Sequence, residues 1–330
     1  MEQFTVSSAG DLDECLQENG IAILPGVLQP GECEALKASL WEGLGYITSR
    51  WEKPLRRGDL SSWVGLHDLD PTCSQRLQHW QVGHLQAAWN VRQHPRVQAA
   101  FATLWGVPPT ELLCSIDGIS VHLPPELTGR GYGESKLHCD QAFTRPERDA
   151  VQGWVNANAI SEGDATFTFL RRSHRFTEAA AERFPSLCTD RCPLSSEMIR
   201  FYASECGSEL HRITCPAGSL VLWDSRTVHG MCGSVRGAEP AEMYLIYVCM
   251  TPRAKATVAS LSKLRTAFYE MRMTGHSPHR PELRPRQPRR SGLALPLMAD
   301  MYPPHVQQHY LVGAAQSPLQ GGEMAAVGKT

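Results

Sequence analysis

The feature that most limits how this chain can fold is a long series of short apolar runs. Between residues 112 and 251, segments rich in Val, Ile, Thr and aromatic residues are separated by Gly, Pro and Asp. This arrangement is typical of the strands and turns of a β-sandwich or barrel. The predicted strands are 115–123, 136–142, 151–160, 166–170, 210–215, 219–224 and 243–251.

Helical patterns flank this region on both sides. Apolar residues recur at helical spacing before and after the predicted strands. The predicted helices are 11–19, 29–43, 85–105 and, after the strands, about 257–273. We therefore expect a mainly β fold with flanking helices.

The length of the chain favours one large domain. A chain of 330 residues can bury a core without disulfide or metal staples. We expect a single domain over residues 1–275 with its core at about 112–253, followed by a Pro/Arg-rich extension over 276–330. The end of that extension, 313–330, is low in large apolar residues and is expected to be flexible.

Charge and cysteine usage exclude several classes of protein. The formal net charge is −2, with 32 Lys and Arg against 34 Asp and Glu, so the whole chain has no field that would attract nucleic acid or a membrane surface. The 11 cysteines lack disulfide spacing, and some stand in apolar runs such as ELLCSI. With no signal-peptide pattern and no membrane-spanning run, we expect a cytoplasmic or other reducing intracellular location.

Three residues have the types and spacing of a metal site. His138 and Asp140 stand two apart in the sequence LHCDQ, so on a strand both side chains point to the same face. His229 follows PAGSLVLWDSRTV, a strand and turn that can bring it to the same rim. Two His and one carboxylate form the facial triad that binds Fe(II) and leaves positions open for oxygen. The structural alternative is an exposed strand whose polar residues face water.

Longer motifs carry a family resemblance. They are ENGIAILPGVLQPGECEALK, HCDQ, GWVNANAISEGDATFTFLRRSHRF and PAGSLVLWDSRTVHG, followed by YLIYVCMTPR. Over residues 11–253 the chain resembles the phytanoyl-CoA dioxygenase-like family of Fe(II)/2-oxoglutarate-dependent oxygenases. The resemblance implies a double-stranded β-helix core, a cupin-like jelly roll. It also implies Fe(II), 2-oxoglutarate and O2 as cofactors, with the metal held by His138, Asp140 and His229.

The resemblance also implies the reaction. Oxidative decarboxylation of 2-oxoglutarate to succinate would drive hydroxylation of an organic substrate. Asp140 favours hydroxylation over halogenation, because a halogenase needs that carboxylate replaced to free a position for halide. The hydroxylated molecule is expected to be a small molecule or a group on a larger carrier.

One position departs from the family. Its members anchor the distal carboxylate of 2-oxoglutarate with an arginine near the start of the last core strand, because a guanidinium pairs bidentately with a carboxylate. Met243 stands at that position here. Arg236 is our candidate replacement by proximity in sequence, with Arg253 as the other basic residue nearby. A solvated loop charge is the structural alternative for Arg236.

Four other residues are candidates for contacts with the co-substrate or substrate. Trp154 and Asn156 alternate along one predicted strand and could line the cavity. Their structural alternative is a hydrogen-bonded row. Ser225 and Thr227 precede His229 and could hold a carboxylate or orient the metal ligand.

Two further patterns favour structural roles. Cys188 and Cys192 lack a second matching pair, so reduced thiols are favoured over a zinc site. The basic segment 279–290 is interleaved with prolines and lacks aromatic partners, which favours an extended strap over nucleic-acid binding.

Two other functions remain open from the sequence. Met243 at the anchor position favours a catalytically silent or regulatory metal-binding protein on the same fold. A cupin-like metalloenzyme that uses no keto acid is the second alternative. Substrate contacts are expected from 46–83, from the partly helical insertion 176–207 and from the helix after Arg253, because loops vary with function.

Overall fold

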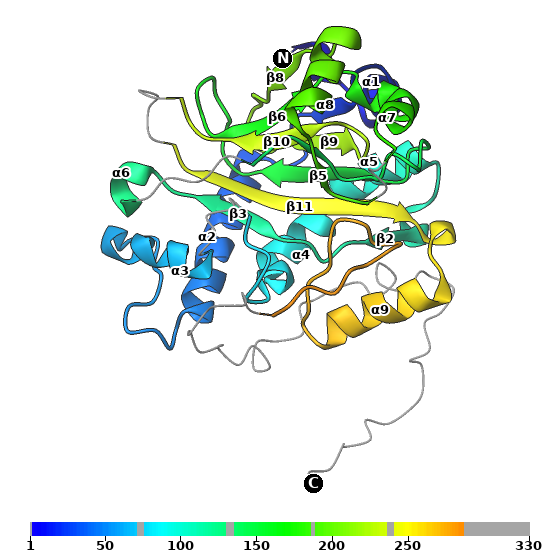
Figure 1. Ribbon diagram of the computed structural model, residues 1–330. Coiled ribbons are helices and arrows are strands. Elements are labelled where there is room, and N and C mark those ends of the chain that lie inside the picture. The colour runs from blue at the N-terminus through cyan, green and yellow to red at the C-terminus, as the bar shows by residue number, and fades with distance from the viewer. Residues whose placement is uncertain (1, 71–75, 130–134, 186–188, 236–240, 287–330) are drawn as a thin grey trace, which may run out of the picture.

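The computed structural model describes residues 2–70, 76–129, 135–185, 189–235 and 241–286. Two antiparallel sheets lie at the centre, with helices around them (Figure 1). The strands are β1 (Ile21–Leu24), β2 (Leu112–Cys114), β3 (Ile119–His122), β4 (His138–Cys139), β5 (Val151–Asn156), β6 (Thr166–Leu170), β7 (Cys192–Pro193), β8 (Leu210–Arg212), β9 (Leu220–Asp224), β10 (His229–Cys232) and β11 (Met243–Pro252).

The strand order confirms the predicted double-stranded β-helix core. One sheet runs β1-β9-β5-β11-β2, with β3 also paired to β11, and the other runs β7-β4-β10-β6-β8. Strands distant in sequence lie side by side, as β1 does with β9 and β4 with β10. The long strand β11 joins β2, β3 and β5 and is buried over nearly its whole length.

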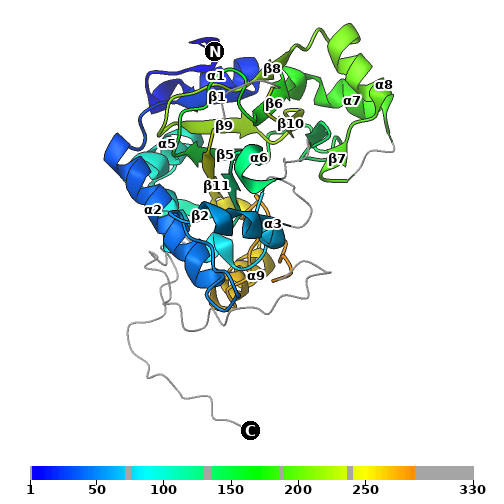
Figure 2. The ribbon, with the colours of Figure 1, turned by 90° about the vertical axis from the view of Figure 1, so that its left-hand side faces the viewer.

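Helices cover the outer faces of the sheets. The six-stranded sheet is flanked by α2, α4 and α9, while α7 and α8 stand with β7 at the opposite end (Figures 1 and 2). The helices are α1 (Leu12–Asn19), α2 (Pro30–Ile47), α3 (Leu66–Leu69), α4 (Gln86–Arg92), α5 (Pro95–Trp105), α6 (Pro125–Thr128), α7 (Thr177–Arg183), α8 (Ser196–Arg200) and α9 (Val258–Tyr269).

Local sequence signals explain where the N-terminal helices begin and end. Helix α1 ends at Gly20, whose φ of 80° is left-handed and suits glycine, and its amide donates to the carbonyl of Leu16 at 2.8 Å. Helix α2 begins at Pro30, and the Gln29 amide donates to the Glu32 carboxylate at 2.7 Å. The predicted helix 85–105 is two helices, because Pro95 starts α5 as a new first turn.

The predicted strand 115–123 is shorter in the structure. Strand β2 ends at Cys114, and β3 begins only at Ile119. Between them the Asp117 carbonyl accepts from Arg92 at 2.7 Å, and the Gly118 amide donates to the Asp117 carboxylate at 2.6 Å. These hydrogen bonds take the place of the backbone pairing that a continuous strand would have at this point. Strand β4 is likewise limited to two residues rather than the predicted 136–142.

The C-terminal part of the described chain folds back onto the core. The Gly275 amide donates to the Glu282 carbonyl at 3.2 Å, and the Trp80 amide donates to the Arg286 carbonyl at 2.8 Å. Arg280 forms an ion pair with Asp149. The described part of the basic segment 279–290 thus makes intramolecular contacts, which supports its interpretation as a strap. The predicted flexible tail 313–330 lies outside the described residues.

Two sequence-based expectations, on membrane-spanning segments and on cysteines, can be compared with the described residues only. In these parts of the chain, no helix combines the length and apolar character needed to cross a bilayer. Cys192 and Cys206 are free thiols there, and Cys188 lies outside the described residues.

Candidate metal centre

The three predicted ligands converge at the junction of β4 and β10. His138 and His229 are directly opposite each other in the β4–β10 pair. The Asp140 carboxylate lies between them, with Oδ1 3.6 Å from Nε2 of His138 and Oδ2 3.4 Å from Nε2 of His229. One ligand atom from each residue lies within 4.8 Å of the other two. A single ion can therefore contact all three side chains.

Backbone carbonyls orient both imidazoles. Nδ1 of His138 lies 2.9 Å from the Lys136 carbonyl oxygen, and Nδ1 of His229 lies 2.8 Å from that of Thr227. A carbonyl only accepts, so each Nδ1 carries the proton and each Nε2 keeps its lone pair for a metal. Burial and the neighbouring His229 lower the pKa of His138 to about 4, so it stays in the neutral form that binds metals.

The Asp140 carboxylate is ionised despite its burial. It is 6% exposed, and burial alone, the largest influence, raises its pKa. The surrounding imidazoles of His276, His229 and His138 outweigh that effect and hold the pKa of Asp140 well below its usual value. A carboxylate and two imidazoles on one side of a cavity fit a divalent transition metal such as Fe(II).

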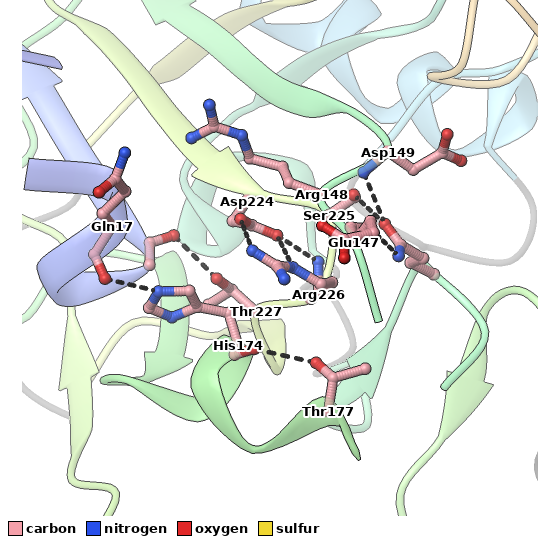
Figure 3. A network of polar contacts seen from close by, with 12 residues as sticks. Gln17, Glu147, Arg148, Asp149, His174, Thr177, Asp224, Ser225, Arg226 and Thr227 are labelled. Carbon is pink, nitrogen blue, oxygen red and sulfur yellow. Dashed lines mark hydrogen bonds and ion pairs between the residues drawn. The ribbon is translucent and has the colours of Figure 1, made fainter. Parts of the chain in front are cut away.

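The turn before His229 is fixed by a buried ion pair (Figure 3). Nε of Arg226 lies 2.9 Å from Oδ1 of Asp224, and Nη2 lies 2.8 Å from Oδ2. Asp224 is 1% exposed. The Thr227 hydroxyl donates to the Gly20 carbonyl at 2.8 Å, which ties the same turn to the end of α1. These contacts set where β10 starts and therefore where His229 points.

We expect Asp224→Ala to loosen this turn. Arg226 would lose both carboxylate bonds, which should cost about 2 kcal/mol in the free energy of unfolding. Metal affinity should fall about tenfold, because an outer residue that orients a ligand typically has an effect of that size. Urea denaturation and competition with a chelator measure the two quantities. Asp68→Ala, at an exposed position, is the matched control, and equal behaviour of both variants would contradict the assigned role.

The ligands face an open cavity of about 200 Å³. Its walls combine aromatic, sulfur-containing and charged side chains. The described residues that line it are Arg76, Gln78, Ser135, His138, Asp140, Phe167, Arg191, Trp223, His229, Gly230, Met231 and Tyr247.

Three ionisable groups beside the ligands were missed by sequence reasoning. Arg191 places Nε 3.7 Å from Oδ1 of Asp140, and His276 places Nδ1 3.8 Å from Oδ2. Arg76 lines the same cavity. Burial, the largest single influence, lowers the pKa of Arg76, but the pKa is raised overall by the neighbouring groups Asp117, Tyr247 and Asp140. Burial is also the main cause that lowers the pKa of His276. Each group belongs to a different segment, and nothing in the local patterns marked them.

The structure gives the four other predicted contact residues different partners, and among described residues none of the four lines the cavity. Trp154 is fully buried in an apolar cluster. The Asn156 amide donates to the carbonyls of Asn158 and Pro216 at 2.6 and 2.8 Å. The Ser225 hydroxyl donates to Gln141 Oε1 at 2.6 Å, and the Thr227 hydroxyl is bonded to Gly20. These hydrogen bonds of Asn156, Ser225 and Thr227 thus go to neighbouring segments of the protein. Arg236 lies outside the described residues.

Comparison with solved structures supports the fold. GlcNAc Inducible Gene 2 from Candida albicans has a TM-score of 0.54 at 14% identity, covering 80% of this chain and 70% of its own. AviO1 from Streptomyces viridochromogenes Tue57 has a TM-score of 0.50 at 14% identity, covering 76% of this chain and 97% of its own. EctD from S. alaskensis has a TM-score of 0.50 at 14% identity, covering 88% of this chain and 86% of its own.

Sequence comparison identifies the family. The Ava biosynthesis cluster protein O of Aspergillus versicolor is 29% identical over 234 residues, which cover 67% of this chain and 72% of the relative. The family model described as phytanoyl-CoA dioxygenase matches residues 16–231, which include all three candidate ligands. The chain therefore belongs to the phytanoyl-CoA dioxygenase family of oxygenases, whose members use Fe(II), 2-oxoglutarate and O2.

Proposed function

We propose that this protein is an Fe(II)- and 2-oxoglutarate-dependent dioxygenase that hydroxylates a small organic molecule or a group on a larger carrier. The observation that carries the proposal is the convergence of Nε2 of His138, Nε2 of His229 and the Asp140 carboxylate at one wall of a cavity. A set of three protein ligands leaves further coordination positions of the metal open to the cavity.

The chain's own residues have three tasks in this reaction. His138, Asp140 and His229 would hold Fe(II), which with 2-oxoglutarate and O2 supplies the oxidising chemistry when bound. The carbonyls of Lys136 and Thr227 keep both imidazoles in the tautomer that presents Nε2. The other side chains that line the cavity place the substrate and limit the entry of water.

Aromatic rings shield the buried side of the metal centre. Phe167 stacks on His229 with ring centroids 5.0 Å apart and an interplanar angle of 16°, and Trp223 lies 5.6 Å from the same ring. His229 is consequently 5% exposed. The apolar wall formed by Phe167, Trp223 and Met231 suits a carbon skeleton, while Arg76 and Arg191 on other walls suit carboxylates. The biosynthetic cluster named for the curated relative supports a small-molecule substrate.

We expect metal-dependent succinate formation from the purified protein. The experiment is anaerobic purification, addition of Fe(II) and 2-oxoglutarate, admission of O2 and measurement of succinate. A library of small organic molecules is then screened for stimulation of succinate formation and for products heavier by one oxygen atom. His94→Ala, which alters a histidine away from the cavity, is the matched control and should behave as wild type.

The alternatives give different outcomes. Stoichiometric metal binding without any consumption of 2-oxoglutarate would favour a silent metal-binding protein or a metalloenzyme that uses no keto acid. Succinate formation with a product that has not gained oxygen would keep the co-substrate assignment and contradict hydroxylation.

A further inference from the structure

The co-substrate needs a second binding group that the metal does not provide. 2-Oxoglutarate can chelate a metal through its keto group and adjacent carboxylate, but its distal carboxylate lies a short carbon chain away and needs a cation or several donors. Met243 stands where the family resemblance implies an arginine. Its side chain is 5% exposed and belongs to an apolar cluster with Trp154 and Trp223. That position offers no partner for a charged group.

Arg76 brings a guanidinium to the same strand from another segment. Met243 and Tyr247 are four residues apart on β11, and both belong to the same buried cluster, so they face the same side of the sheet. The guanidinium carbon of Arg76 lies 5.1 Å from the centre of the Tyr247 ring, in a cation–π contact. Arg76 and Tyr247 both line the cavity that holds the three candidate ligands.

The segment that carries Arg76 is firmly attached to β3. The Leu77 amide donates to the Ile119 carbonyl at 2.8 Å, and the Ile119 amide donates back to the Leu77 carbonyl at 3.2 Å. The close approach requires glycine at 118, because a Cβ there would lie 2.3 Å from the Leu77 carbonyl oxygen. The guanidinium is therefore positioned by backbone pairing rather than by a free loop.

Neighbouring polar groups shape a site suited to a carboxylate. With its amide oxygen turned toward Arg76, Gln78 accepts from Nη2 at 2.6 Å and from Nε at 3.0 Å, which fixes the plane of the guanidinium. The Tyr247 hydroxyl lies 3.1 Å from the hydroxyl of buried Ser120. The guanidinium can donate to both oxygens of a carboxylate, and the Tyr247 hydroxyl in the same cavity is a further donor.

The second arginine of the cavity is less suitable for this task. Nε of Arg191 lies 3.7 Å from Oδ1 of Asp140, so its charge is next to a candidate metal ligand. The side chain of Arg191 is 37% exposed. Its position suits the cavity mouth rather than the end of a chelated keto acid.

We infer that Arg76, supported by Tyr247, binds the distal carboxylate of 2-oxoglutarate and takes over the role that Met243 cannot fill. The inference rests on the proposed function and adds the residue that selects a keto diacid over a keto monoacid. It also accounts for co-substrate use by a chain without the arginine on the last core strand.

Binding measurements without turnover test the inference. Calorimetry in the absence of O2 measures how the Mn(II)-loaded protein binds 2-oxoglutarate and 2-oxopentanoate, which has a methyl group in place of the distal carboxylate. The wild type should prefer 2-oxoglutarate. Arg76→Gln should weaken 2-oxoglutarate binding about 100-fold, as for a lost buried charge partner, and leave 2-oxopentanoate binding and metal occupancy unchanged. Arg191→Gln tests the second arginine of the cavity, and loss of the preference in that variant would overturn the inference. Arg96→Gln, at an exposed position on α5, is the matched control and should keep the preference.

Each outcome bears on a specific claim. If Arg76→Gln keeps the preference for 2-oxoglutarate, the inference is overturned. If Arg236→Gln loses that preference instead, the anchor is Arg236. If the wild type binds neither keto acid, the proposed function itself fails. If Arg76→Gln does not fold, Arg76→Lys replaces it. This variant keeps the positive charge but loses the two-pronged guanidinium, so it should bind 2-oxoglutarate about tenfold more weakly than the wild type. An affinity equal to that of the wild type would overturn the inference.

Discussion

Replacing His138 with alanine is expected to abolish stoichiometric Fe(II) binding and succinate formation. The variant loses one of three convergent ligands, and the metal affinity should fall by more than about 100-fold, since even outer residues account for 10- to 100-fold effects. The His138 side chain is 23% exposed and stands on a strand of two residues. The fold should therefore survive, with the free energy of unfolding changed by less than about 1 kcal/mol.

Metal content and thermal denaturation of the same sample separate the two effects. Iron per chain, measured after gel filtration, should fall to background, while the melting temperature of the metal-free protein stays near that of the metal-free wild type. His94→Ala controls for the loss of an imidazole elsewhere. Stoichiometric iron in His138→Ala would remove the ligand assignment.

Arg92→Met is expected to be the most destabilising single change among those considered. Arg92 is 1% exposed at the end of α4. Its guanidinium donates to the carbonyls of Gly83, Asp117 and Tyr247 at 2.6, 2.7 and 3.3 Å. Methionine fills similar volume but donates nothing, so three buried carbonyls lose their partner. The free energy of unfolding should fall by about 4 kcal/mol.

Urea denaturation checks this value against an exposed arginine. Arg96→Met, at an exposed position on α5, should change the free energy of unfolding by about 0.5 kcal/mol or less. A loss in Arg92→Met no greater than that of Arg96→Met would show that the carbonyls find other donors. Because Asp117 precedes β3 and Tyr247 lines the cavity, Arg92→Met should also weaken keto-acid binding in any fraction that stays folded.

Strand periodicity explains both what was predicted well and what was not. The two-residue spacing of His138 and Asp140 placed both on one face, and the structure brings them together with His229. The same spacing indicated that Trp154 and Asn156 share a face. Spacing along a strand does not, however, give the distance of a side chain from the candidate ligands. Asn156 stands at the end of β5 and bonds to the Pro216 carbonyl in a turn.

Two of the regions expected to approach the substrate each contribute an arginine to the cavity. Arg76 comes from 46–83 and Arg191 from 176–207, and both line the cavity of the candidate ligands. His276, which lies beside Asp140, comes from just beyond the predicted helix 257–273. Loops carry no periodicity, so their side-chain directions depend on contacts such as the Leu77–Ile119 pairing. Arg236, the anchor candidate chosen by proximity in sequence, lies outside the described residues.

The sequence by itself determined the β-rich core, the family and the three residues able to hold iron, because these depend on short-range spacing and local motifs. The tertiary structure decided which ionisable groups lie beside them. Arg76, Arg191 and His276 are far apart along the chain, and they meet only because distant segments pair with or fold over the same sheets. Sequence spacing contains no information about such encounters.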